Sequence, residues 1–461
     1  MIRNGSVVTD SGTLQVDVGI RRGRIDAISS ALPSGTNVID AIGKLVLPGG
    51  IDAHTHFANE VGGSRTADDF ESGTISAAFG GITTIINYAI QSPRQPLAEA
   101  IGLDLSRAQE SSVIDFSSHL IVTDPSIAGF DSQMAELVGL GCPSVKVFTA
   151  VDDFRLPDRD LLRVLRAARR HGIMVNVHAE DGAMIDDLTD ELLAAGHVGI
   201  RWLPRSRPPL VEATAIRRVA SYAQQVGTPV YFVHVSSAAG LRAIRDARSE
   251  GATVYAETRP AYLFLDESCY DGDERQARYV ACWPPIRAIS DQAALWDGIA
   301  DATIDTYATD HTSWMAAEKL RPNLNFGEVP GGFANVETSI GMLFGEGVAT
   351  GRISLARFVD VTATRPAKIF GMWPRKGSIA VGSDADIVII DPAAEITITE
   401  EMSHSRSDVL AYRGRRTTGW PVTTISRGEV VVDHGMLLGA KGRGRPAERK
   451  QMPGPGCASQ G

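Results

Sequence analysis

The chain has few cysteines, no long hydrophobic run and no excess of basic residues. Its four cysteines contain no Cys-x-x-Cys pair, which is typical of free thiols in a reducing compartment rather than of a disulfide framework. No apolar run reaches the length of a membrane span, and the first residues, MIRNGSVVTD, lack the apolar segment of a signal peptide. The formal net charge of −10 disfavours a nucleic-acid or anionic-membrane surface. We therefore expect a soluble cytoplasmic protein that binds neither nucleic acid nor membranes.

The middle of the chain alternates short β-branched runs with stretches of helical period. Between the runs lie segments such as RDLLRVLRAARRHG, which ends at a glycine of the kind favoured after a helix. Strands that alternate with crossover helices predict a parallel sheet, and eight units favour a closed (β/α)8 TIM-like barrel over residues 49–375. An open doubly wound sheet is the alternative, because periodicity does not reveal closure. The eight runs lie at residues 44–54, 82–88, 113–120, 144–149, 173–178, 229–235, 252–257 and 303–310.

The two ends of the chain have a different pattern. Residues 1–48 and 376–438 contain stretches, such as GSIAVGSDADIVIID and PVTTISRGEVVVDHGMLL, in which apolar and polar positions alternate between glycine turns. This period is typical of half-buried antiparallel strands. Neither end is long enough for a good core of its own, so we expect both to form one small β-sandwich beside the barrel. The basic, Gly/Pro-rich tail at 439–461 is expected to be extended or disordered.

Polar residues interrupt the predicted barrel strands near their ends. His54 and His56 share one face of the first strand, because side chains two residues apart point the same way. Six polar residues lie near the ends of predicted strands: His54, His56, Lys146, His178, His234 and Asp310. The carboxyl ends of barrel strands form the active-site face, so we expect all six side chains to converge there.

This set of side chains predicts a metal site. Imidazole and carboxylate ligands suit Zn²⁺ and similar divalent ions. The ammonium group of Lys146 cannot ligate a metal, but a neutral amine can react with CO₂ to give a carbamate that bridges two ions. A simple salt bridge is the alternative for Lys146.

The chain resembles the amidohydrolase superfamily, in the hydantoinase/dihydropyrimidinase branch of cyclic amidohydrolases. The resemblance covers nearly the whole chain. DDFESGT and the ordered metal set are specific features, whereas His-x-His alone is not. The supporting stretches are PGGIDAHTHF, TADDFESGTISAAFGGITTII, VKVF, VNVHAED, VYFVHVSS, ATDH, PAKIF and RKGSIAVGSDADIVIIDP.

The resemblance implies a binuclear metal centre, with Zn²⁺ as the expected ion and Mn²⁺ as the alternative. His54, His56 and Asp310 would hold the more buried ion. His178 and His234 would hold the more exposed one.

The resemblance also implies the reaction. Lys146, as N6-carboxylysine, and a hydroxide would bridge both ions, and the hydroxide would attack a carbonyl of a cyclic amide such as a hydantoin, a dihydropyrimidine or a cyclic imide. Asp310 would carry the proton to the leaving nitrogen. A homodimer or homotetramer is expected.

Two positions depart from the family pattern. Val151 stands where the family has a tyrosine that donates a hydrogen bond to the substrate, and Trp283 stands where a serine often precedes the Pro-Pro pair. Trp283 is either a packed core residue or a stacking wall for a flat substrate. We also expect Phe148 and Asn335 to contact substrate. These changes predict an altered ring preference with the metal chemistry intact.

Other functions share parts of this pattern. An allantoinase would have the same metal set, a superfamily deaminase would not need Lys146, and a non-catalytic dihydropyrimidinase-like protein would be expected to have lost ligands. Dihydroorotase is disfavoured, because its His-x-His-x-Arg pattern has Ala58 at the arginine position here.

Overall fold

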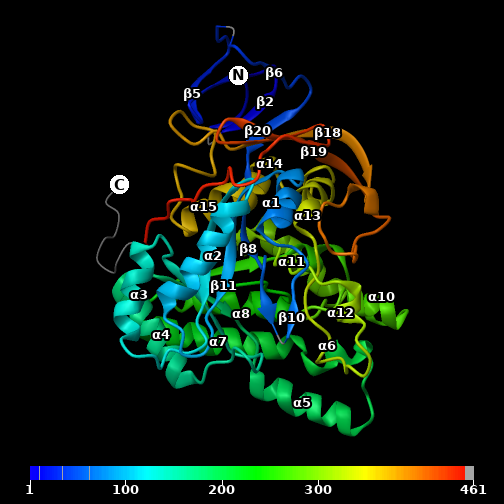
Figure 1. Cartoon of the computed structure of the whole chain (residues 1–461). Coiled ribbons are helices and arrows are strands. Elements are labelled where there is room, and N and C mark those ends of the chain that lie inside the picture. Colours follow the sequence, from blue (N-terminus) through cyan, green and yellow to red (C-terminus); the bar gives the residue numbers. More distant parts are fainter. Residues whose placement is uncertain (10, 34, 62, 452–461) are drawn as a thin grey trace.

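Eight parallel strands form a barrel in the middle of the chain (Figure 1). The computed structural model describes residues 1–9, 11–33, 35–61 and 63–451. The barrel closes where Thr55 bridges His311 and the backbone N–H of His56 donates to the carbonyl of His311 at 2.9 Å. The predicted (β/α)8 fold is therefore confirmed, and the open sheet is excluded. The strands pair in sequence order: β8 (Gly50–Thr55), β11 (Ile82–Ile90), β12 (Asp115–Ile121), β13 (Ser144–Phe148), β14 (Met174–His178), β15 (Val230–Phe232), β16 (Val254–Thr258) and β17 (Thr306–Tyr307).

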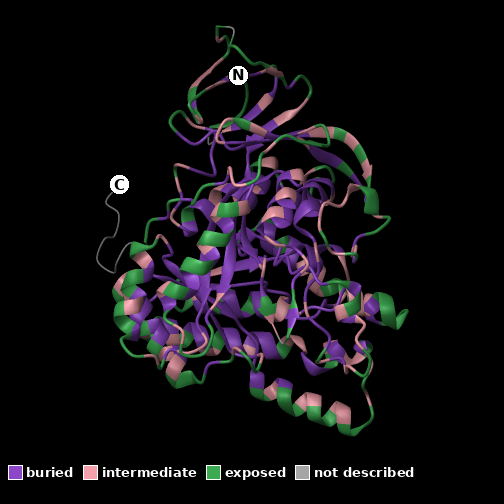
Figure 2. Cartoon of the chain, in the orientation of Figure 1, coloured by how far each residue is buried: buried purple, intermediate pink, exposed green. Residues whose placement is uncertain are grey.

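Amphipathic helices cover the outside of the barrel, with their exposed faces outward (Figure 2). Helix α4 (Asp158–His171) illustrates the pattern, because Leu161, Val164, Leu165 and Ala168 are buried at helical spacing. Among the described residues, no helix combines the length and apolar composition that a membrane span needs. The other helices are α1 (Phe70–Phe79), α2 (Leu97–Ser111), α3 (Phe130–Gly139), α5 (Gly182–Ala194), α6 (Leu203–Ser206), α7 (Pro209–Val226), α8 (Ala238–Ser249), α9 (Pro260–Phe264), α10 (Glu274–Tyr279), α11 (Ile289–Ala300), α12 (Ala316–Lys319), α13 (Val336–Leu343), α14 (Leu355–Val359) and α15 (Arg365–Ile369).

Strands from both ends of the chain form two further sheets above the barrel (Figure 1). Apolar residues from both ends, including Val7, Val46 and Ile389, share one hydrophobic core. One sheet has the order β5 (Arg24–Ser29), β4 (Asp17–Arg21), β1 (Ile2–Arg3) and β6 (Ile39–Asp40). The other has the order β21 (Met436–Leu437), β20 (Glu429–Asp433), β19 (Arg416–Ser426), β18 (Ile387–Thr397), β7 (Leu45–Pro48), β2 (Ser6–Thr9) and β3 (Gly12–Gln15). A short hairpin in the loop after β8 pairs β9 (Glu60–Val61) with β10 (Ser64–Arg65).

Two strand predictions need correction. The apolar run at 44–54 is two strands in two sheets, because β7 pairs with β18 and β2 whereas β8 enters the barrel. Gly49 lies at the crossing point, where a Cβ would collide with Thr83. The alternating stretch at 377–386 is not a strand, and β18 begins only at Ile387.

The described part of the tail lies along the barrel. Gly444 donates to the carbonyl of Ser112, Pro446 bridges Phe116, and the buried guanidinium of Arg449 donates to Ser144 Oγ at 2.6 Å. Residues 439–451 are therefore an extended segment held by hydrogen bonds. The prediction for the rest of the tail lies outside the described residues. The three cysteines among the described residues, Cys142, Cys269 and Cys282, are free.

A buried ion cluster joins the amino-terminal end of the barrel to the sheets. Lys376 Nζ lies 2.8 Å from Asp115 Oδ2 and 2.5 Å from Asp386 Oδ2, and all three side chains are at most 4% exposed. Asp384 completes a group of three carboxylates whose oxygens are close enough for a metal. The ammonium group of Lys376 already supplies the positive charge there, so the cluster has a structural role.

Replacing Lys376 with methionine should destabilise the fold. Arg427 pairs with Asp115 and Arg375 pairs with Asp384, so the variant Lys376→Met would leave the buried Asp386 without a cation. Breaking a comparable buried pair costs about 3–5 kcal/mol. Urea unfolding would measure the loss. The control Lys441→Met removes an exposed ion pair with Glu71 and should change the unfolding curve little. Equal stability of Lys376→Met and the unmodified protein would contradict this interpretation.

Candidate active site

The six side chains selected from the sequence all lie at the carboxyl ends of barrel strands. His54 is in β8, and His56 follows its last residue. Lys146 is in β13, and His178 ends β14. The other two, His234 and Asp310, lie in the loops just beyond β15 and β17.

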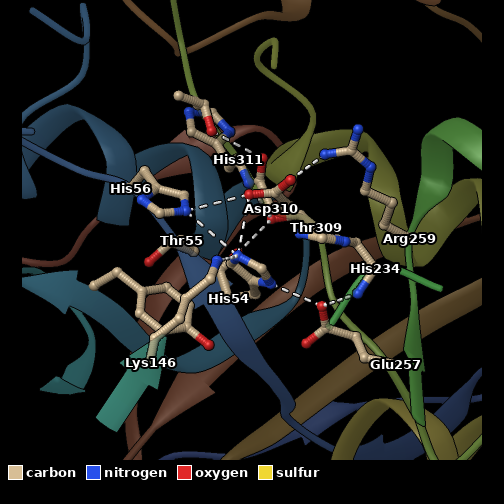
Figure 3. A network of polar contacts seen from close by, with 12 residues as sticks. His54, Thr55, His56, Lys146, His234, Glu257, Arg259, Thr309, Asp310 and His311 are labelled. Carbon is tan, nitrogen blue, oxygen red and sulfur yellow. Dashed lines mark hydrogen bonds and ion pairs between the residues drawn. The ribbon is translucent and has the colours of Figure 1, made fainter. Parts of the chain in front are cut away.

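Four of these groups converge on one point (Figure 3). His54 Nε2 lies 3.0 Å from Lys146 Nζ, 3.1 Å from Asp310 Oδ1 and 3.3 Å from His56 Nε2. His56 Nε2 lies 3.2 Å from the same oxygen of Asp310. The ligand atoms of His54, His56 and Asp310 are all within 4.8 Å of one another, a donor set that fits a divalent metal ion.

The remaining two histidines form an adjacent pair. The ring centroids of His178 and His234 are 4.6 Å apart, and those of His234 and His54 are 5.7 Å apart. His178 Nε2 lies 2.7 Å from Glu180 Oε2, so the other ring nitrogen of His178 remains available as a ligand.

Burial lowers the pKa of four of these six groups, whereas the pKa of His54 is raised, because Glu257 and Asp310 outweigh burial there. Burial lowers the pKa of His56 to about 4 and the pKa of His234 well below its usual value, so both rings are neutral at pH 7, as metal binding requires. Burial also lowers the pKa of the Lys146 ammonium to about 8, although Asp310 and Glu257 oppose the shift. A larger share of Lys146 is therefore the neutral amine that reacts with CO₂.

Glu257 supports His54 and was not among the residues predicted from the sequence. Its Oε1 lies 2.7 Å from His54 Nδ1 and accepts the backbone N–H of His234 at 3.0 Å, and the side chain is fully buried. Such a carboxylate fixes the orientation and tautomer of a ligand imidazole. The sequence could have indicated Glu257, because this residue ends a predicted strand, as His178 does.

Apolar side chains form the wall of the cavity in front of the predicted metal ligands. Phe148 stacks on His178 with 5.0 Å between ring centroids, and Val151 follows β13 with a φ of 70°. Trp283 is half-buried, and the guanidinium of Arg207 lies 5.1 Å from its ring centre. The lining includes His56, Lys146, His178, His234, Asp310, Phe148, Val151, Trp283 and Trp314.

Asn335 lies apart from this wall. It is not among the residues that line the cavity. Its side-chain amide donates to the carbonyl of Thr309 at 3.0 Å, and its backbone N–H donates to His311 Nδ1. The structure therefore shows Asn335 supporting the segment that carries Asp310.

Comparisons with known proteins agree with this geometry. Residues 45–431 match the amidohydrolase family. The chain belongs to this family. It is 40% identical to a D-hydantoinase of Ralstonia pickettii over 98% of this chain and 99% of the relative. A D-phenylhydantoinase of Escherichia coli is 39% identical over 98% of both chains. The crystal structure of dihydropyrimidinase from Brevibacillus agri superimposes with a TM-score of 0.96 at 38% identity, covering 98% of this chain and 99% of that one.

These relatives confirm the resemblance to the hydantoinase/dihydropyrimidinase branch. These relatives are named hydantoinases or dihydropyrimidinase, and they match this chain over nearly its full length. They therefore do not favour the allantoinase, deaminase or non-catalytic alternatives.

The contact between Glu257 and His54 predicts weaker metal binding in Glu257→Gln. The amide oxygen of glutamine can still accept from the imidazole N–H but carries no negative charge, and loss of such a charged partner typically costs about 10- to 100-fold in metal affinity. Competition with a chelator would measure the change. Glu337→Gln is a matched control, because Glu337 Oε1 lies 2.7 Å from Nδ1 of His404, an imidazole that is not among the predicted ligands. The interpretation is wrong if both variants bind metal equally.

Proposed function

We propose that this chain hydrolyses an amide bond in a small ring of the hydantoin, dihydropyrimidine or cyclic imide type. The observation that carries the proposal is the convergence of His54, His56 and Asp310 beside Lys146 in a chain with full-length hydantoinase relatives. It matches the enzyme class predicted from the sequence.

The proposed cofactors are two divalent ions, Zn²⁺ or Mn²⁺. His54, His56 and Asp310 would hold one ion. His178 and His234 would hold the other, and carboxylated Lys146 would be shared by both. Bound ions of this kind activate a water and polarise the carbonyl that it attacks.

Asp310 supplies the proton transfer in this proposal. Burial would raise the pKa of its carboxyl, but His54 and Arg259 outweigh that effect and hold the pKa well below its usual value. The group is therefore an anion at neutral pH. It can accept a proton from the attacking water and deliver it to the ring nitrogen that leaves.

The cavity wall supports a flat substrate with an apolar substituent. Phe148, Val151 and Trp283 offer aromatic and aliphatic surface but, apart from the indole N–H, no side-chain donor. The contact of substrate with Asn335 stays a prediction. We also propose that the enzyme acts in the cytoplasm, as its free cysteines suggest, and as a homodimer or homotetramer.

A substrate panel tests the proposed function. The metal-loaded protein would be assayed with hydantoin, 5-phenylhydantoin, dihydrouracil, succinimide, allantoin and dihydroorotate. We expect ring opening with at least one of the first four compounds and loss of activity after chelation. Turnover of allantoin or dihydroorotate alone, or no ring opening at all, would overturn the proposal.

A tyrosine at position 151 should restore a missing donor. Val151 cannot donate a hydrogen bond, and one well-placed donor to a developing oxyanion is worth up to about 10²-fold in kcat. We expect Val151→Tyr to open 5-substituted hydantoins or dihydrouracil faster than the unmodified enzyme. Val151→Phe is the matched control, since it adds the ring without the hydroxyl. No gain over Val151→Phe in a folded protein would count against this role.

A further inference from the structure

Arg259 is a buried arginine next to the proposed metal site. It follows the last residue of β16 and precedes α9. Its side chain is only 1% exposed and is among the largest fully buried side chains in the described chain. The proposed chemistry assigns it no step.

The guanidinium has one hydrogen-bond partner among the described residues. Nη1 donates to Asp310 Oδ2, and the guanidinium carbon lies 4.7 Å from the ring centre of Tyr262. Nε and Nη2 are buried and have no partner in the described part of the chain.

Stability does not explain such a residue. Burying a cation with unsatisfied donors is unfavourable, and apolar side chains of similar volume often replace buried ion pairs without loss of stability. The buried Lys376 differs from Arg259 in this respect, because its ammonium group has two carboxylates within hydrogen-bond distance. Apart from its stacking on Tyr262, the specific contact of Arg259 is the hydrogen bond to Asp310.

Asp310 needs an anchor because the strand does not fix its direction. It lies beyond the end of β17 with a φ of 50°, outside the regular alternation of strand side chains. Figure 3 shows its carboxylate between the two histidines and Arg259. Oδ1 faces His54 and His56, and Oδ2 faces the guanidinium.

We propose that Arg259 is a positioning residue that holds Oδ2 of Asp310 so that Oδ1 stays directed at His54 and His56. The role rests on the proposed function, because it matters where Asp310 ligates metal and moves a proton. A flexible ammonium would hold the oxygen less well than the planar guanidinium, whose donors have fixed directions.

Three variants test this role. Arg259→Met removes the charge at similar length, and Arg259→Lys keeps the charge. Arg449→Met is the matched control, since Arg449, in the tail, is also buried but donates to Ser144, the first residue of β13, and to the carbonyl of Phe370. Thermal unfolding, the Zn²⁺ dissociation constant from chelator competition, and kcat and KM on the ring compound that the unmodified enzyme opens would be measured for each.

We expect Arg259→Met to remain folded with a lower unfolding temperature, because Asp310 loses a buried cationic partner. It should lose about 10²-fold in kcat with little change in KM, because a misplaced catalytic group costs this much. Its Zn²⁺ dissociation constant should rise about 10-fold, as for the loss of other partners of metal ligands. Arg259→Lys should recover part of both losses, and Arg449→Met should show neither.

The role is wrong if Arg259→Met binds Zn²⁺ as tightly as the unmodified protein, or if Arg449→Met loses the same affinity. The Zn²⁺ measurement needs no turnover, so it tests the role of Arg259 even if the enzyme opens no ring compound. A complete lack of ring opening would refute the proposed function but not the role of Arg259.

Discussion

The site depends on the closure of the barrel between its first and last strands. The bridge between Thr55 and His311 and the hydrogen bond from His56 to His311 join two segments that are far apart in the sequence. The same seam places His54 and His56 against Asp310. Without this closure the three ligand atoms would not meet, so the fold and the proposed metal centre share one constraint.

The two ends of the barrel use buried charge differently. At the amino-terminal end, Lys376 and its carboxylates satisfy one another and join the barrel to the sheets. At the carboxyl-terminal end, two donor nitrogens of Arg259 have no partner in the described part of the chain, and Lys146 Nζ lies 3.0 Å from an imidazole nitrogen of His54. Unsatisfied buried polar groups cost stability. Their place at the active-site face indicates that function rather than stability determines them.

The sequence predicted which side chains lie near the carboxyl ends of the barrel strands, because strand periodicity and strand ends are local features. His54 and His56 were recognisable from their spacing and from the apolar run before them. The apolar run at 44–54 was wrongly predicted as one strand, because no local feature of the sequence shows that the chain passes from one sheet to another at Gly49.

Contacts between segments that are far apart in the sequence could not be predicted from local patterns. Glu257 and Arg259 have the same two-residue spacing at a strand end as the two histidines, which was a usable signal. Their partners, His54 and Asp310, follow only from the closed barrel. Asn335 was expected at the substrate, but its amide donates to Thr309, a partner that only the folded chain reveals.

Native mass spectrometry of gently purified protein would count the ions on each chain and detect a carboxylated Lys146. We expect two divalent ions and one CO₂ adduct on each unmodified chain, and loss of the adduct and of both ions in Lys146→Ala. A chain that carries a single ion without the adduct, or a Lys146→Ala variant that keeps both ions, would contradict this expectation.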